Sequence, residues 1–196
     1  MCSGIAAINF KEYCERMERY SLSQNSCGQL DNFYCNDIFG FPITGDGDCA
    51  FASIIRQLRK SYEWQNAIYG NLRKHLTDLG LGGSVDNDVY RLRQLFVNVV
   101  QSNEDYQVLL GIDKEEMNYE TERFREEGTF CGEMGDLIMK VCSDILHVPI
   151  IVVTSIPGSS YVPFIPEQHV MTETLYISFN AYGPGHYDAT SLLYDQ

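Results

Sequence analysis

The sequence of 196 residues has no apolar run long enough to cross a membrane and has few basic residues. A membrane-spanning helix needs about 18 or more consecutive apolar residues, and the N-terminal stretch MCSGIAAINFKEYCERMERY becomes charged before a signal-type apolar core develops. Lys and Arg number 14 against 27 Asp and Glu, which gives a net charge of −13. Such a surface repels a phosphate backbone. These features predict a soluble, intracellular protein, cytoplasmic or nuclear, that binds neither membrane nor nucleic acid.

The cysteines and histidines lack the spacing of a disulfide framework or a metal site. The seven cysteines, at positions 2, 14, 27, 35, 49, 131 and 142, are an odd number without CxxC pairs, so neither paired disulfides nor a zinc site is indicated. The four histidines are scattered, and no P-loop, dinucleotide fingerprint or internal repeat is present. The sequence therefore predicts no metal and no cofactor.

Polar stretches divide the chain into two unequal parts. Residues 8–20 are expected to form a short amphipathic helix, and the following stretch SLSQNSCGQLDN has the composition of a linker. This pattern predicts an N-terminal extension over residues 1–37 and a main domain over 38–196. Within that domain, residues 113–127 carry seven acids against three bases, which is typical of a solvated helical face.

The apolar period changes along the main domain. Four stripes with helical spacing are expected to bury one face of a helix each; they begin at Phe51, Ile68, Val89 and Met134. The C-terminal part instead has strand-like segments, namely PIIVVT, SSYVPF, TLYISFN and the stretch that begins near His186. Because helices come first and strands last, the predicted class is α+β, with helices packed on a small central β-sheet.

The stretch GDGDCAF, residues 45–51, places Cys49 at the start of a predicted helix. A cysteine thiol is mostly protonated at neutral pH, and a helix N-terminus or a histidinium partner favours the nucleophilic thiolate. With Asp46 as the N-cap, Cys49 would lie in the first turn, where spare backbone N–H groups can bind an oxyanion. Asp48 is expected to face solvent, because a second carboxylate beside the sulfur would disfavour the thiolate.

The stretch GPGHYDA near the C-terminus supplies a histidine and an acid. His186 and Asp188 are two residues apart, so in a strand both side chains lie on one face while Tyr187 points the other way. An aspartate that accepts one imidazole N–H fixes the tautomer and supports an imidazolium that can pair with a thiolate. The histidines that lack such a setting are His75, His147 and His169.

Together, DGDCAF and the downstream GHYDA resemble the signature of the ovarian tumour (OTU) cysteine proteases. That signature is Asp-Gly-x-Cys followed by an aromatic or apolar residue, with His-x-Asp or His-x-Asn near the C-terminus. The similarity runs from about Phe39 to Leu193 and includes the helix and strand of GTFCGEMGDLIMKVCSDILHVPIIVV. Many members have a tryptophan near Phe130 and Cys131, a difference that concerns packing. The resemblance implies a papain-like cysteine protease fold of OTU type.

The resemblance also implies a role for each motif residue. Cys49 would be the nucleophile, His186 the general base and Asp188 the orienting acid. Asp46 would shape the catalytic loop. The backbone amides expected to form the oxyanion hole are those of Asp46, Gly47 and Asp48. The family mostly hydrolyses isopeptide bonds after the C-terminal Gly-Gly of ubiquitin, so the expected partners of this monomer are ubiquitin or polyubiquitin chains, or ubiquitin-like modifiers, and an acidic surface suits the basic surface of ubiquitin.

Two alternatives stay open at this point. The chain could be an OTU-like ubiquitin-binding module that is catalytically weak or inactive, although all three catalytic residue types are present. It could also be a cysteine hydrolase or transferase with another substrate, which a ubiquitin C-terminal electrophile would distinguish. Linkage preference among ubiquitin chains is expected to depend on loop surfaces, with residues 81–88 and 102–116 as candidates.

Overall fold

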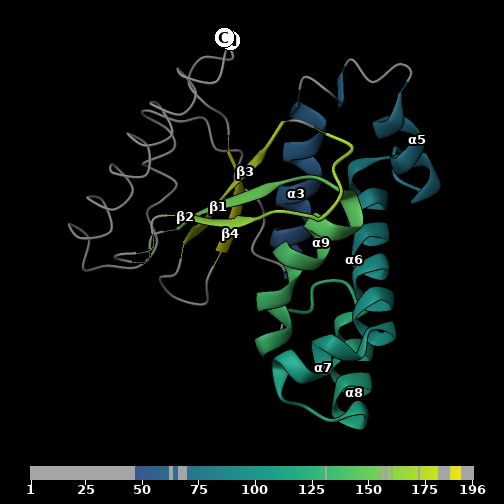
Figure 1. Ribbon diagram of the computed structural model, residues 1–196, viewed down its shortest axis with the longest axis vertical. Coiled ribbons are helices and arrows are strands. Elements are labelled where there is room, and N and C mark those ends of the chain that lie inside the picture. The colour runs from purple at the N-terminus through teal and green to yellow at the C-terminus, as the bar shows by residue number, and fades with distance from the viewer. Residues whose placement is uncertain are drawn as a thin grey trace.

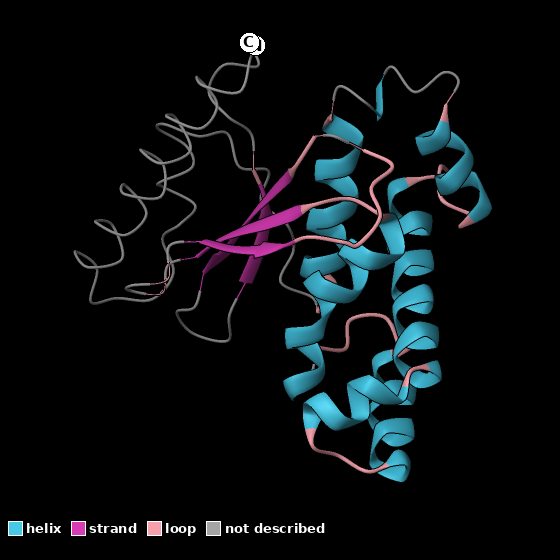
Figure 2. Ribbon diagram, viewed as in Figure 1, coloured by secondary structure: helices cyan, strands magenta, loops and turns pink. Residues whose placement is uncertain are grey.

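The computed structural model describes residues 47–61, 64–65, 70–130, 132–154, 156, 159, 161–171, 173–180 and 186–190. Within these residues the chain forms six α-helices, a 3₁₀ helix and a four-stranded sheet (Figures 1 and 2). The helices are α3 (Cys49–Lys60), α5 (Asn71–Asp78), α6 (Val85–Ser102), α7 (Glu104–Leu110), α8 (Lys114–Phe124), the 3₁₀ helix η1 (Gly132–Leu137) and α9 (Ile138–Leu146). The strands are β1 (Ile150–Thr154), β2 (Tyr161–Phe164), β3 (Leu175–Asn180) and β4 (His186–Ala189).

The predicted α+β class is confirmed, with helices first and strands last. The predicted extension over residues 1–37, its helix over 8–20 and the boundary at residue 38 lie outside the described residues. None of the described helices is both long and apolar enough to cross a bilayer.

The sheet is mixed, with the strand order β2-β1-β3-β4. Strands β1 and β3 are parallel, and Ile150 lies opposite Leu175. Strands β3 and β4 are antiparallel, and their last pair joins Asn180 to His186. Strand β4 therefore lies at an edge of the described sheet, and His186 is its first residue.

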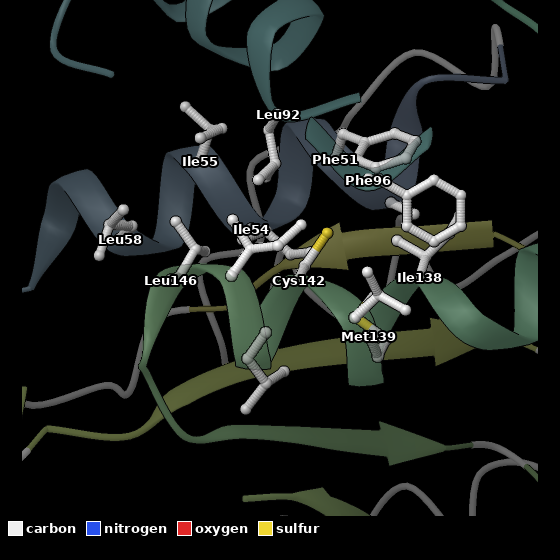
Figure 3. Close-up of a cluster of buried hydrophobic side chains, with 14 of the residues drawn as sticks. Phe51, Ile54, Ile55, Leu58, Leu92, Phe96, Ile138, Met139, Cys142 and Leu146 are labelled. Atoms are coloured by element: carbon white, nitrogen blue, oxygen red, sulfur yellow. The ribbon is translucent and has the colours of Figure 1, made fainter. Parts of the chain in front are cut away.

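Helix α3 lies at the centre of the described fold, where it packs against β3 and β4 of the sheet and against the helices α6 and α9 (Figure 1). Its predicted stripe is buried, since Phe51, Ile54, Ile55 and Leu58 are each at most 1% exposed. Burying one such side chain contributes about 1.5–3 kcal/mol. Figure 3 shows the stripe in contact with side chains from the two neighbouring helices, among them Leu92, Phe96, Ile138, Met139, Cys142 and Leu146. This packing fixes the position of α3 and of the cysteine at its first residue.

Helix boundaries follow local signals in the sequence. The Ser84 side chain accepts a hydrogen bond from the Asn87 N–H and caps α6. Helix α9 ends at His147, whose φ of 54° is left-handed. The stripe that begins at Met134 is divided between two elements, because residues 132–137 are a 3₁₀ helix and the α-helix starts only at Ile138.

Helix α7 was not predicted, and the expectation of a loop over residues 102–116 is wrong for most of that segment. Asn103 caps α7, and Gly111 with φ of 66° ends it. No residue of α7 is buried, and its apolar residues Val108 and Leu109 are 82% and 67% exposed. Its apolar contact with the core is limited to the partly buried Tyr106 and Leu110, and a single i, i+4 pair is too short a pattern to predict a helix.

Candidate active site

Cys49 is the first residue of α3, and its side chain is almost buried, with 6% exposed. The preceding residue, Asp48, occupies the N-cap position with φ of −96° and ψ of −3°. The Asp48 carbonyl accepts the first helical hydrogen bond, from the Ala52 N–H at 2.9 Å. The prediction of Asp46 as the N-cap is therefore wrong by two residues, and Asp46 itself lies outside the described residues.

Asp48 does not face solvent as predicted. Its carboxylate accepts hydrogen bonds from Arg93 Nε at 2.8 Å, from Arg93 Nη2 and from the Gly128 N–H at 3.0 Å. The Arg93 side chain has no exposed surface, and that of Asp48 is 20% exposed. A buried guanidinium requires an anion and hydrogen-bond acceptors, and this requirement turns the carboxylate inward. Asp48 consequently makes no capping hydrogen bond with its side chain.

His186 and Asp188 lie side by side on β4, as the two-residue spacing predicted. The distance from His186 Nε2 to Asp188 Oδ1 is 3.1 Å. The Asp188 side chain is 7% exposed and that of His186 is 29% exposed, so the histidine keeps one accessible edge. Between them, Tyr187 packs its ring on Phe179 of β3 at a centroid distance of 4.6 Å. This stacking helps to hold the strand that carries both functional side chains.

The packing of α3 on β4 brings His186 to the sulfur of Cys49. The hydrogen bond with Asp188 and then the hydrogen bond with Cys49 raise the pKa of His186 from 6.5 to about 10, although its partial burial acts in the opposite direction. Because Nε2 is bonded to Asp188, the ring nitrogen left for the sulfur is Nδ1. The imidazole is therefore protonated at neutral pH and is placed as the charge partner of a thiolate.

The two histidines associated with helices, His75 and His147, contact each other. His75 Nε2 lies 2.9 Å from the Ile145 carbonyl oxygen, and the ring stacks on that of His147 at 4.4 Å. Burial and then the neighbouring His75 lower the pKa of His147. His169 is an exposed loop residue. No group of three or more His, Cys, Asp or Glu side chains among the described residues is placed to hold a metal ion.

Cys142 is the second described free cysteine, and it lies in the core between helices. Complete burial raises the pKa of its thiol far above the ordinary value. A buried protonated thiol is a poor nucleophile, so Cys142 has a packing role.

Sequence reasoning missed Arg93 and its partners. The residue lies in the apolar stripe of α6, next to Leu92 and three residues before Phe96, and a charged residue is rarely fully buried there without a partner. That position was the available signal for a buried ion pair. Its partner, 45 residues earlier in the chain, was not deducible from the spacing.

Together, a cysteine at a helix N-terminus, a histidine whose pKa that cysteine raises, and an aspartate bonded to the histidine form the arrangement needed for acyl transfer through a thiolate. The sequence model of the family described as OTU-like cysteine protease matches residues 44–187, a range that contains all three side chains. No curated protein matches the sequence significantly.

Solved structures of OTU proteins share the fold at low sequence identity. The structure of h/ceOTUB1 with ubiquitin aldehyde and UBCH5B~Ub has a TM-score of 0.56 and 10% identity and covers 95% of this chain and 98% of that one. A related complex with UBC13~Ub has a TM-score of 0.53 and 12% identity, with 93% and 96% covered. The OTU domain of OTUD1 has a TM-score of 0.51 and 16% identity, with 92% and 99% covered.

Proposed function

Because this chain belongs to the OTU-like cysteine protease family, we propose that it is an intracellular deubiquitinase. It hydrolyses the isopeptide bond that follows the C-terminal Gly-Gly of ubiquitin or of a ubiquitin-like modifier. The observation that carries the proposal is the position of His186, which lies 3.1 Å from Asp188 Oδ1 and close enough to the Cys49 thiol for both groups to raise its pKa. A catalytically inactive binding module has no need of a histidine held between a thiol and a carboxylate.

The proposed reaction begins from a thiolate on Cys49 and an imidazolium on His186. The sulfur attacks the carbonyl carbon of the substrate glycine and forms a tetrahedral intermediate. The groups proposed to stabilise its negative oxygen are the backbone N–H groups of Asp46, Gly47 and Asp48, the three residues that precede Cys49 in the sequence. His186 then donates its proton to the leaving lysine amine as the C–N bond breaks, and a thioester remains.

The thioester is hydrolysed by the reverse sequence of proton transfers. Neutral His186 accepts a proton from water as the water oxygen attacks the thioester carbon. The second tetrahedral intermediate collapses to the Cys49 thiolate and the C-terminal carboxylic acid of the modifier, which then loses its proton to water and leaves as a carboxylate. Asp188 orients the imidazole and stabilises its protonated form in both halves of the reaction.

Ubiquitin as the substrate is supported by two observations. The matched OTUB1 structures are complexes with ubiquitin aldehyde, a C-terminal derivative of ubiquitin. The net charge of −13 also suits the approach of a partner with a basic surface and a basic C-terminal tail. The chain is proposed to act as a monomer.

The test uses ubiquitin and ubiquitin-like proteins that carry a C-terminal coumarin amide, together with a panel of di-ubiquitins of each linkage. We expect the wild-type protein to release coumarin from at least one of them. Cys49→Ala should abolish turnover and retain ubiquitin affinity within about twofold, because the substitution removes the attacking atom from a site of nearly the same shape.

Three outcomes would contradict the proposal. Turnover by Cys49→Ala would assign the nucleophile elsewhere. Wild-type protein that binds ubiquitin without cleaving it would be a binding module. Wild-type protein whose Cys49 reacts with iodoacetamide but not with any ubiquitin-like C-terminal electrophile would be a cysteine hydrolase or transferase with another substrate.

A further inference from the structure

Arg93 uses all of its hydrogen-bond donors inside the protein. Its Nε and Nη2 both donate to Asp48 Oδ1, the first at 2.8 Å, and Nη2 also donates to the Gly47 carbonyl oxygen at 2.9 Å. Nη1 donates to the carbonyl oxygens of Phe124 at 2.7 Å and Thr129 at 2.8 Å. An arginine has five N–H donors, so the guanidinium has no donor left for any other group.

The guanidinium is also enclosed by aromatic rings. Its Cζ lies 4.8 Å from the ring centroid of Phe51, on α3, and 5.1 Å from that of Phe124, on α8. Contacts of this kind stabilise a desolvated cation. Arg93 therefore joins α6, the start of α3 and the segment after α8 through contacts that only one orientation of its planar group satisfies.

The two residues before Cys49 have little freedom to move away from this cluster. Gly47 has φ of 87°, and a Cβ at this position would lie 2.0 Å from the Gly128 carbonyl oxygen. The Gly128 N–H donates to Asp48 Oδ2 at 3.0 Å. The turn that contains Gly47 and Asp48 is thus held by backbone contact with residue 128 on one side and by the guanidinium on the other.

We infer that Arg93 is a positioning residue, which holds the Gly47–Asp48 turn so that the N–H groups before Cys49 face the developing oxyanion. The inference rests on the proposed cysteine hydrolase chemistry. Arg93 does not contact the reacting atoms, and it acts through the backbone of the turn. Loss of its geometry should weaken stabilisation of a tetrahedral oxyanion while the reactivity of the sulfur itself is retained.

The molecule contains a matched control for this network. At the other end of α3, Asp88 of α6 accepts hydrogen bonds from Arg59 Nη2, from the Gly82 N–H at 3.0 Å and from the Gly83 N–H at 2.9 Å. Asp88 is 1% exposed. This second ion pair joins the same two helices and also combines an arginine, a carboxylate and glycine amides, but none of its hydrogen bonds involves Gly47 or Asp48.

The experiment compares two reactions of Cys49. Acylation by p-nitrophenyl acetate passes through a tetrahedral oxyanion, whereas alkylation by iodoacetamide displaces iodide and forms no oxyanion. The background from other cysteines is subtracted with Cys49→Ala. The acylation rate divided by the alkylation rate is a measure of oxyanion stabilisation. This ratio does not depend on the fraction of Cys49 that is thiolate, so it is unaffected by a change in that fraction when the charge of Asp48 is removed.

Arg93→Lys keeps the positive charge and loses the planar set of donors, and Asp48→Asn keeps the shape and loses the charge. We expect each substitution to lower the ratio about 10- to 100-fold, the size of effect seen when an oxyanion donor is misplaced or lost. On a ubiquitin coumarin amide, kcat should fall and KM should stay within about twofold. Arg59→Lys and Asp88→Asn should leave the ratio within about twofold, because any effect they have is on packing alone.

An unchanged ratio in folded Arg93→Lys or Asp48→Asn overturns the inference, and so does an equal fall in the two control variants. If Arg93→Lys does not fold, Asp48→Asn decides, because that carboxylate is partly exposed. Wild-type protein that is alkylated but not acylated at Cys49 also overturns it. The expected fall in the ratio for Arg93→Lys and Asp48→Asn, together with no cleavage of any ubiquitin-like substrate by the wild-type protein, rejects the proposed substrate and retains Arg93 as a positioning residue.

Discussion

At the scale of single residues, the site depends on the charge that His186 carries. Asp188 is the main cause of the raised pKa of His186, and Cys49 is the second. The imidazolium is thereby available as the acid for the leaving amine, whereas an unperturbed histidine would be mostly neutral at pH 7. Asp188 contributes by bonding to the imidazole ring.

Asp188→Asn is therefore expected to be milder than His186→Ala. An asparagine oxygen still accepts the imidazole N–H, whereas loss of the imidazole removes the proton donor and the partner of the thiolate. The measurement is kcat/KM on a ubiquitin coumarin amide. Equal losses in the two variants would contradict the roles proposed for these residues.

His186 also predicts a dependence of stability on pH. Its pKa in the folded state, about 10, lies above the ordinary value of 6.5. A group whose pKa is raised by folding stabilises the protein fully below its unfolded value, and this contribution disappears as pH rises through the folded value. The window of loss therefore extends from about pH 6.5 to about pH 10.

We expect the difference in melting temperature between the wild-type protein and His186→Gln to shrink as pH rises across this window. The same comparison in a Cys49→Ala background isolates the pair with Asp188, the first cause of the shift, and should keep the same sign. A difference that is constant, or that grows with pH, would show that the imidazolium is not stabilised by the fold.

At the scale of elements, partly buried ion pairs near both ends of α3 join this helix to α6. Asp48 and Arg93 join them beside the nucleophile, and Arg59 and Asp88 join them at the opposite end. Removing one partner from a buried pair is costly because the other charge is left without a counterion. The turn before Cys49 has a further constraint, since only a glycine fits at position 47.

Gly47→Ala is expected to lower both stability and kcat. Its Cβ would overlap the backbone of Gly128, which must then shift with the turn. The matched control is Gly111→Ala, which also has a left-handed φ, 66°, but has open space around the added Cβ. That variant should lose about 1 kcal/mol through backbone strain and keep its kcat. Urea unfolding and steady-state kinetics measure both effects, and equal behaviour of the two variants would exclude a special role for the contact with Gly128.

At the scale of the whole molecule, the net charge of −13 concerns the encounter with substrate. Attraction between exposed charges is screened by salt, with a Debye length that falls from about 10 Å at 0.1 M to about 3 Å at 1 M. We expect kcat/KM on ubiquitin substrates to fall as salt rises across this range, while acylation of Cys49 by the uncharged small ester stays nearly constant. A salt effect of the same size on both reactions would show that salt acts on the reaction at Cys49 and not on the association with ubiquitin.

Much of the fold could be predicted because it depends on local patterns. The stripe from Phe51 to Leu58 marked α3, and the stripe that begins at Val89 marked α6. The continuous apolar run PIIVVT marked β1, and the alternating segment TLYISFN marked β3. Helix α7 escaped prediction because only Tyr106 and Leu110 pack against the core, and one i, i+4 pair is too short a periodic signal. Its boundaries come from local groups at its ends, the Asn103 cap and Gly111.

The sequence by itself determined the three chemical groups of the site and their local settings: Cys49 at a helix start, and His186 with Asp188 on one face of a strand. Residue type and short spacing suffice for this, because strand alternation and helix polarity are properties of the backbone. Only the tertiary structure decided which way Asp48 points and which residue holds it. That outcome depends on α6, which places the buried Arg93 guanidinium next to the turn before Cys49. A buried cation needs an anionic partner, and the partner can be far away in the sequence.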